Sequence, residues 1–119
     1  LLRAALVEGG ADFVASLIMG GRPEEAHYAW GRAHEGEVWT RFEAEMRGSD
    51  TSDWIANNHR ATEDWPAALG YFVGHQIAKA YYDGASDKRA AVAALLRLED
   101  PERILRESGY AGRFATPSE

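Results

Sequence analysis

The chain contains no cysteine, and this absence limits its chemistry. Disulfide bonds, thiolate metal sites and cysteine nucleophiles are excluded, so any metal would have to be held by histidine, aspartate or glutamate. An excess of basic residues is also absent, because 13 lysines and arginines stand against 19 acidic residues and give a net charge of −6. Nucleic-acid binding depends on clustered basic side chains, so we expect no nucleic-acid partner.

Long apolar runs are missing as well. No stretch approaches the roughly 18 apolar residues needed to cross a bilayer, so no membrane span is expected. The apolar N-terminal stretch is interrupted by Arg3, Glu8 and Asp12, which distinguishes it from a secretion signal. Because the chain begins at Leu1 without a methionine and apparently within a helix, we expect a fragment of a larger protein. The residues do not decide between a location in the cytoplasm and one in the cell envelope.

The pattern of apolar residues predicts an all-α protein. No segment alternates in the period of a β-strand, whereas helical spacing recurs along the chain. We expect five or six helices packed around the most apolar one, at about residues 67–83, in a single domain of residues 1–114 with a tail at 115–119. The helices are predicted at residues 1–19, 23–31, 35–47, 67–83, 87–98 and 101–109.

Small residues form a stripe on the predicted central helix, at Gly70, Gly74 and Ala78. Each glycine within a helix costs about 1 kcal/mol relative to alanine. Glycines at this spacing therefore predict that another helix or a ligand approaches closely.

Glu8 and Asp12 lie four residues apart on the first predicted helix, which otherwise carries many apolar side chains. A carboxylate near a buried face is costly unless a cation or a hydrogen-bond donor meets it. The spacing alone allows three interpretations: two solvated acids, an Asp12 that supports a neighbouring helix, or a metal ligand with a supporting acid.

Two segments, Glu8–Ala15 and Leu69–Ile77, resemble a bacterial family of predicted zinc-dependent proteases of the gluzincin type. Relatives of the gliding-motility lipoproteins share this pattern. The resemblance runs in the right order from about the first residue to Tyr110. It implies the C-terminal helical part of a zinc metallopeptidase with a peptide or protein substrate. In that family's arrangement Glu8 would bind zinc, and Asp12 would orient a zinc-ligating histidine.

The chain lacks the His-Glu-x-x-His motif that supplies a gluzincin with two zinc ligands and its general base. Its four histidines all follow Glu8 in the sequence. We therefore expect zinc in the full-length protein and none on this chain, which would be inactive without a missing N-terminal segment. The alternative is a non-catalytic helical binding or scaffold protein of the same fold.

Tyr71 and His75 lie one turn apart on the predicted central helix. In a zinc peptidase such side chains could donate a hydrogen bond to the oxyanion, so both are candidate catalytic residues. The alternative is that they are core residues whose polar atoms are satisfied within the protein.

Four tryptophans are many for this length, and we expect all of them to pack in the structure. If an N-terminal part is missing, the first helix would expose an apolar face, through which a homodimer is possible. The tryptophans are Trp30, Trp39, Trp54 and Trp65.

Overall fold

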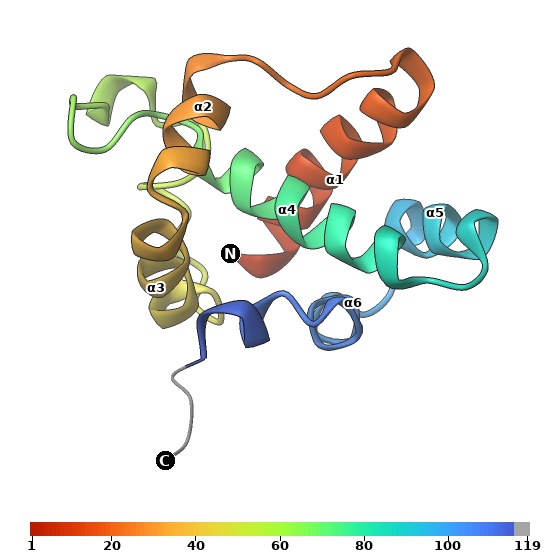
Figure 1. Cartoon of the computed structure of the whole chain (residues 1–119). Coiled ribbons are helices and arrows are strands. Elements are labelled where there is room, and N and C mark those ends of the chain that lie inside the picture. The colour runs from red at the N-terminus through yellow and green to blue at the C-terminus, as the bar shows by residue number, and fades with distance from the viewer. Residues whose placement is uncertain (116–119) are drawn as a thin grey trace.

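A computed structural model describes residues 1–115 and confirms the predicted all-α fold. The described residues form six α-helices and two short 3₁₀ helices, and no β-strand (Figure 1). The predicted tail, apart from Ala115, lies outside the described residues. The elements are α1 (Leu2–Met19), α2 (Ala26–Ala33), α3 (Glu35–Glu45), η1 (Asn58–Arg60), α4 (Leu69–Gly84), α5 (Lys88–Arg97), α6 (Pro101–Ser108) and η2 (Ala111–Phe114).

Helix α4 lies at the centre of the molecule, as predicted (Figure 1). It packs against α1, α2, α3, α5 and α6, and most of its sides are buried, so its apolar character follows from its position. Its buried residues are Leu69, Gly70, Phe72, Val73, Gly74, His75, Ile77, Ala78 and Ala80.

Glycines let the backbones of α1 and α4 touch. A methyl group added at Gly74 would overlap the carbonyl of Ala5, and one added at Gly9 would overlap the carbonyl of Tyr71. A methyl group at Gly70 would lie 2.7 Å from the Cδ1 atom of Ile55, in the loop before α4. The predicted close approach is confirmed, and the partner at Gly74 is another helix.

Side-chain caps fix two helix starts that the sequence predicts. The carboxylate of Asp87 accepts a hydrogen bond from the Ala90 amide (3.0 Å), and that of Asp100 accepts one from the Arg103 amide (3.2 Å). Such caps satisfy amides that have no partner within the helix. Pro101 occupies the first turn of α6, where its missing amide hydrogen costs nothing.

Two predicted boundaries were wrong. Helix α2 begins at Ala26 rather than at residue 23, because the backbone of Glu25 is extended and the Pro23 carbonyl accepts a hydrogen bond from Arg32 (3.1 Å). Helix α4 begins at Leu69 rather than at residue 67, because Ala68 is left-handed (φ 66°). The side chain of Asn57 accepts the Ala68 amide hydrogen (2.8 Å) and holds this turn.

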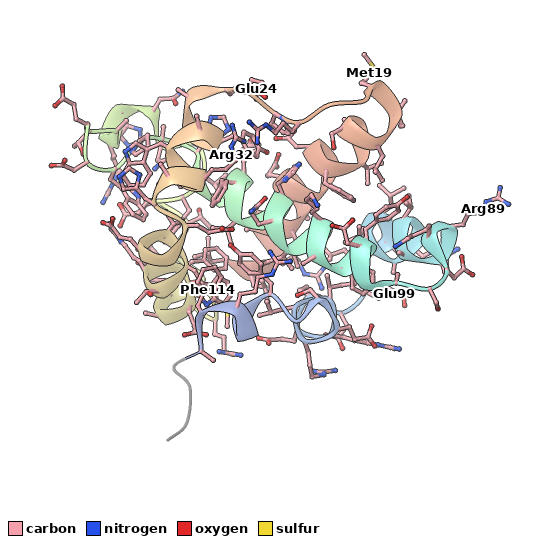
Figure 2. All side chains as sticks on the ribbon, in the orientation of Figure 1. Met19, Glu24, Arg32, Arg89, Glu99 and Phe114 are labelled. Carbon is pink, nitrogen blue, oxygen red and sulfur yellow. The ribbon has the colours of Figure 1, made fainter. Side chains whose placement is uncertain are left out.

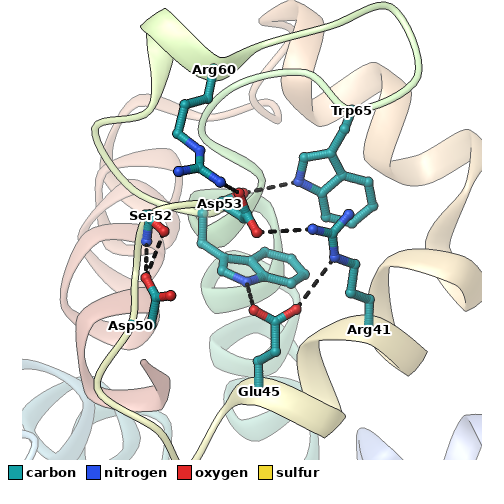
Figure 3. A network of polar contacts seen from close by, with 8 residues as sticks. Arg41, Glu45, Asp50, Ser52, Asp53, Arg60 and Trp65 are labelled. Atoms are coloured by element: carbon teal, nitrogen blue, oxygen red, sulfur yellow. Dashed lines mark hydrogen bonds and ion pairs between the residues drawn. The ribbon is translucent and has the colours of Figure 1, made fainter.

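The loop between α3 and α4 is anchored by tryptophan. Trp54 is fully buried, and its ring meets those of Phe42 and Trp65 edge to face at 5.1 Å each. Figure 3 shows the polar layer beside these rings, in which Arg41 reaches both Glu45 (3.3 Å) and Asp53 (2.9 Å). Packing is confirmed for all four tryptophans: Trp39 and Trp54 are buried, and Trp30 and Trp65 are partly buried against the core.

Apolar side chains are exposed at the end of α1 that points away from the body of the molecule. Ile18 is 79% exposed and Met19 is 82% exposed, and Met19 is seen at this end in Figure 2. The predicted homodimer through the face of this helix stays a prediction. No helix in the described part of the chain has the length and apolar character needed to cross a membrane.

Candidate functional site

Three of the four residues predicted from the sequence as site residues meet where α1, α2 and α4 join. Asp12 comes from α1, and Tyr71 and His75 come from α4. Between them lies Tyr28 of α2, which is 1% exposed. Its hydroxyl donates a hydrogen bond to the Asp12 carboxylate (2.5 Å) and lies 3.5 Å from the Tyr71 carbonyl. Sequence reasoning missed Tyr28 as a site residue, because its local pattern on α2 does not show that its hydroxyl meets Asp12 of α1.

Asp12 therefore supports a neighbouring helix, one of the interpretations that the spacing allowed. Burial and the hydrogen bond to Asp12 raise the pKa of Tyr28 far above its ordinary value, so its hydroxyl stays protonated and continues to donate. Burial is the main cause that raises the pKa of Tyr71, and the negative charge of the half-buried Glu8 raises it further. The metal role of Glu8, with Asp12 in support, and the catalytic roles of Tyr71 and His75 stay predictions.

The bond between Tyr28 and Asp12 should be measurable as a coupling energy. Tyr28→Phe leaves a half-buried carboxylate without its donor and should lower the free energy of unfolding by about 1.5–3 kcal/mol. Asp12→Ala should cost a similar amount, and the double variant should cost less than the sum of the two. Urea titration followed by circular dichroism measures all three, with Tyr81→Phe as control because no side-chain hydrogen bond involves that hydroxyl in the described structure. Strictly additive losses would contradict the coupling.

His75 is buried, but its polar atoms are not satisfied. The side chain is 6% exposed, and neither ring nitrogen has a hydrogen-bond partner among the described residues. Its ring packs edge-on against Phe13 (5.6 Å) and Tyr28 (5.4 Å). Burial lowers the pKa of His75 below its ordinary value, which keeps the imidazole neutral at pH 7.

This burial predicts a stability that depends on pH. A histidine with a lowered pKa in the folded state contributes stability above its unfolded pKa of about 6.5, and this stability is lost as the pH falls. The Gln76 side chain and the charge of Asp12 oppose the shift, whereas Lys79 and Arg32 add to it. The urea concentration at the unfolding midpoint should therefore decrease as the pH is lowered from 8 to 5.5. His75→Leu should make this decrease smaller. Part of the decrease should remain, because burial also lowers the pKa of His27. Equal slopes in both proteins would contradict the assignment to His75.

An open pocket of about 310 Å³ lies at the edge of the same corner. Both alanines that line it, Ala56 (φ 51°) and Ala68 (φ 66°), are in the left-handed region, which is unfavourable for residues other than glycine. Backbone strain of this kind is concentrated at functional sites. The lining residues are Asp12, Glu25, His27, Ala56, Asn57, Asn58, Ala68 and Tyr71.

Comparisons with known proteins test the resemblance drawn from the sequence. A family model described as gliding motility protein GldB matches residues 15–112. No curated protein and no solved structure matches the chain. The family is one of lipoproteins, and of the two predicted locations it supports the cell envelope.

The match corrects the sequence-based interpretation. The identification as a gluzincin-type zinc protease, with its metallopeptidase function, zinc and hydrolase chemistry, was wrong, because the matching family is not a protease family. Within residues 1–115 no three histidine, aspartate or glutamate side chains are grouped to hold a metal. Acids four apart are common on helices, and here Asp12 meets a tyrosine hydroxyl. Since the match covers most of its length, the chain belongs to the gliding motility protein GldB family.

Proposed function

We propose that the chain is a non-catalytic helical binding module that serves gliding motility at the cell envelope. The observation that carries this proposal is the family match over residues 15–112. The engagement of Asp12 by Tyr28 supports it, because a carboxylate that holds two helices together already has a structural role.

The pocket at the corner of α1, α2 and the loop before α4 is the candidate binding site. Its carboxylates, Asp12 and Glu25, favour a ligand with basic or amide groups, such as a segment of a partner protein. The strained turns at Ala56 and Ala68 hold the buried side chain of Asn57 against the Ala68 amide, so the wall of the pocket is organised before any partner arrives. A preorganised wall lowers the entropic cost of binding.

Deletion of the gene in the organism that encodes the chain tests the motility role. We expect the deletion strain to lose gliding of single cells, and the full-length gene supplied in trans to restore it. The protein should sediment with the envelope fraction. A deletion strain that glides at the normal speed, or a protein confined to the soluble fraction, would overturn the proposal.

A second measurement separates binding from catalysis. We expect the purified full-length protein to contain no stoichiometric zinc by elemental analysis, and Glu8→Ala to leave the metal content unchanged. Glu37→Ala, at an exposed position on α3, is the matched control. Stoichiometric zinc that is lost in Glu8→Ala and kept in Glu37→Ala, together with peptide hydrolysis, would contradict a non-catalytic module.

A further inference from the structure

A second cavity, of about 260 Å³, has Tyr28 and His75 in its wall and is lined by positive charge. Its basic side chains come from four places in the chain: the connection before α2, α2 itself, α4 and η2. No acidic side chain lines it, although the chain carries a net charge of −6. The lining residues are Arg22, Tyr28, Arg32, His75, Gln76, Lys79, Ala80 and Arg113.

The existing ion pairs use only part of this charge. Arg22 and Arg32 share one carboxylate, that of Glu24, at 3.1 and 3.7 Å, and Glu24 is itself 70% exposed. Figure 2 shows Glu24 and Arg32 near one another above α4. Lys79 pairs with Asp83 on the surface (2.6 Å). Three of the four cations therefore share two carboxylates, and solvent weakens these ion pairs.

Arg113 adds a charge that has no carboxylate partner among residues 1–115. Its guanidinium lies over the ring of Tyr110, 5.3 Å from the centroid, and no carboxylate of the described residues is within 4.0 Å of it. A guanidinium in this state can still donate two parallel hydrogen bonds to an oxyanion.

His75 provides the second, independent sign of a ligand. It is a lining residue of the cavity, it is 94% buried, and both of its ring nitrogens lack partners among the described residues. A buried polar group without a hydrogen bond is costly, and such groups in native proteins often meet a ligand or an ordered water. Both nitrogens are closed off from solvent, so His75 belongs to the wall of the cavity and is not a donor that already faces a ligand.

We propose that this cavity binds a single phosphate group, as inorganic phosphate or as a phosphomonoester. Arg32 and Arg113 would hold its oxygens in bidentate fashion, and Lys79 and Arg22 would supply charge. Gln76 contributes little, because its amide already donates to Glu35 (2.7 Å). The volume lies just below the roughly 300 Å³ at which pockets for drug-sized ligands begin, so the site fits a compact anion.

Isothermal titration of the 119-residue chain at low ionic strength tests this proposal, with inorganic phosphate and glycerol 3-phosphate as separate probes. We expect one saturable site for at least one probe. Arg32→Gln and Arg113→Gln should each weaken binding about 10-fold or more, since each removes charge-assisted hydrogen bonds. Arg89→Gln removes the same charge from the exposed surface of α5, far from Arg32 in Figure 2, and should leave affinity unchanged.

The two probes distinguish the sources of the phosphate. Binding of inorganic phosphate identifies a free ion, and binding of glycerol 3-phosphate alone identifies an esterified group. The ring ¹⁵N resonances of His75 should shift on saturation, whereas those of the exposed His59 should not. Melting curves show whether each variant is folded. Absence of binding to the folded wild-type chain, equal binding by all three arginine variants, or equally tight binding of chloride would overturn the proposal.

Discussion

Gly74→Ala is expected to lower the free energy of unfolding by about 3 kcal/mol or more, the upper end of the usual cost of overpacking. The new methyl group would overlap the carbonyl of Ala5 and lie 3.1 Å from the Cα atom of Gly9. Both neighbours are backbone atoms of α1, so no side-chain rotation can make room. The two helices would have to separate, and the contacts of the central helix with the core would loosen together.

Gly10→Ala is the matched control for this substitution. Gly10 is also a buried helical glycine, but no atom lies within 4 Å of the methyl group that alanine would add. Alanine favours the helix over glycine by up to about 1 kcal/mol, so this variant should be neutral or more stable. Urea unfolding followed by circular dichroism compares the two proteins. Equal stabilities for Gly74→Ala and Gly10→Ala would show that α1 and α4 do not meet through glycine.

Trp54→Ala should cost about 3–5 kcal/mol, the usual range for removal of a large buried aromatic side chain. The indole is fully buried between Phe42 and Trp65, and its nitrogen donates to Glu45 (3.3 Å). Trp54→Ala would leave a cavity under the loop before α4, although the Trp54 carbonyl and Cβ that Gly70 approaches would remain. Because this loop positions Asn57 and Ala68, the candidate binding pocket that these two residues line should lose its shape as well.

A graded pair of substitutions tests this role of Trp54. Trp54→Phe keeps part of the aromatic contact and should cost less than half as much as Trp54→Ala. Leu96→Ala, at a position that is 63% exposed, should change the stability little. Unfolding midpoints in urea measure all three. A loss below 1 kcal/mol for Trp54→Ala would contradict the view that this residue anchors the loop.

Helix positions could be predicted from local signals in the sequence. The capping residues Asp87 and Asp100 and the paired glycines after α1 act on neighbouring residues, so their effects are visible without the fold. The glycines of α4 showed that something approaches closely, and the structure adds that the neighbour at Gly74 is α1. The start of α4 was missed because it depends on Asn57, eleven residues away from the alanine amide that it holds.

The candidate sites were harder to predict, because their members are far apart in the sequence. The basic side chains of the phosphate cavity come from residues 22, 32, 79 and 113, and only the packing of α2, α4 and η2 brings them together. Burial of His75 was one of the expected alternatives, but its unsatisfied nitrogens are a property of the packed structure. The spacing of Glu8 and Asp12 gave a peptidase interpretation because spacing does not show what Asp12 contacts.

The gliding speed of single cells that carry Glu8→Ala in the full-length gene tests the central claim most directly. Glu8 is the residue that a zinc peptidase of the resembled kind could not lose, whereas a binding module does not need it for metal. We predict that these cells glide at the speed of the wild type, with normal amounts of the protein in the envelope fraction. Cells that make normal amounts of the variant protein and do not glide would contradict a non-catalytic role.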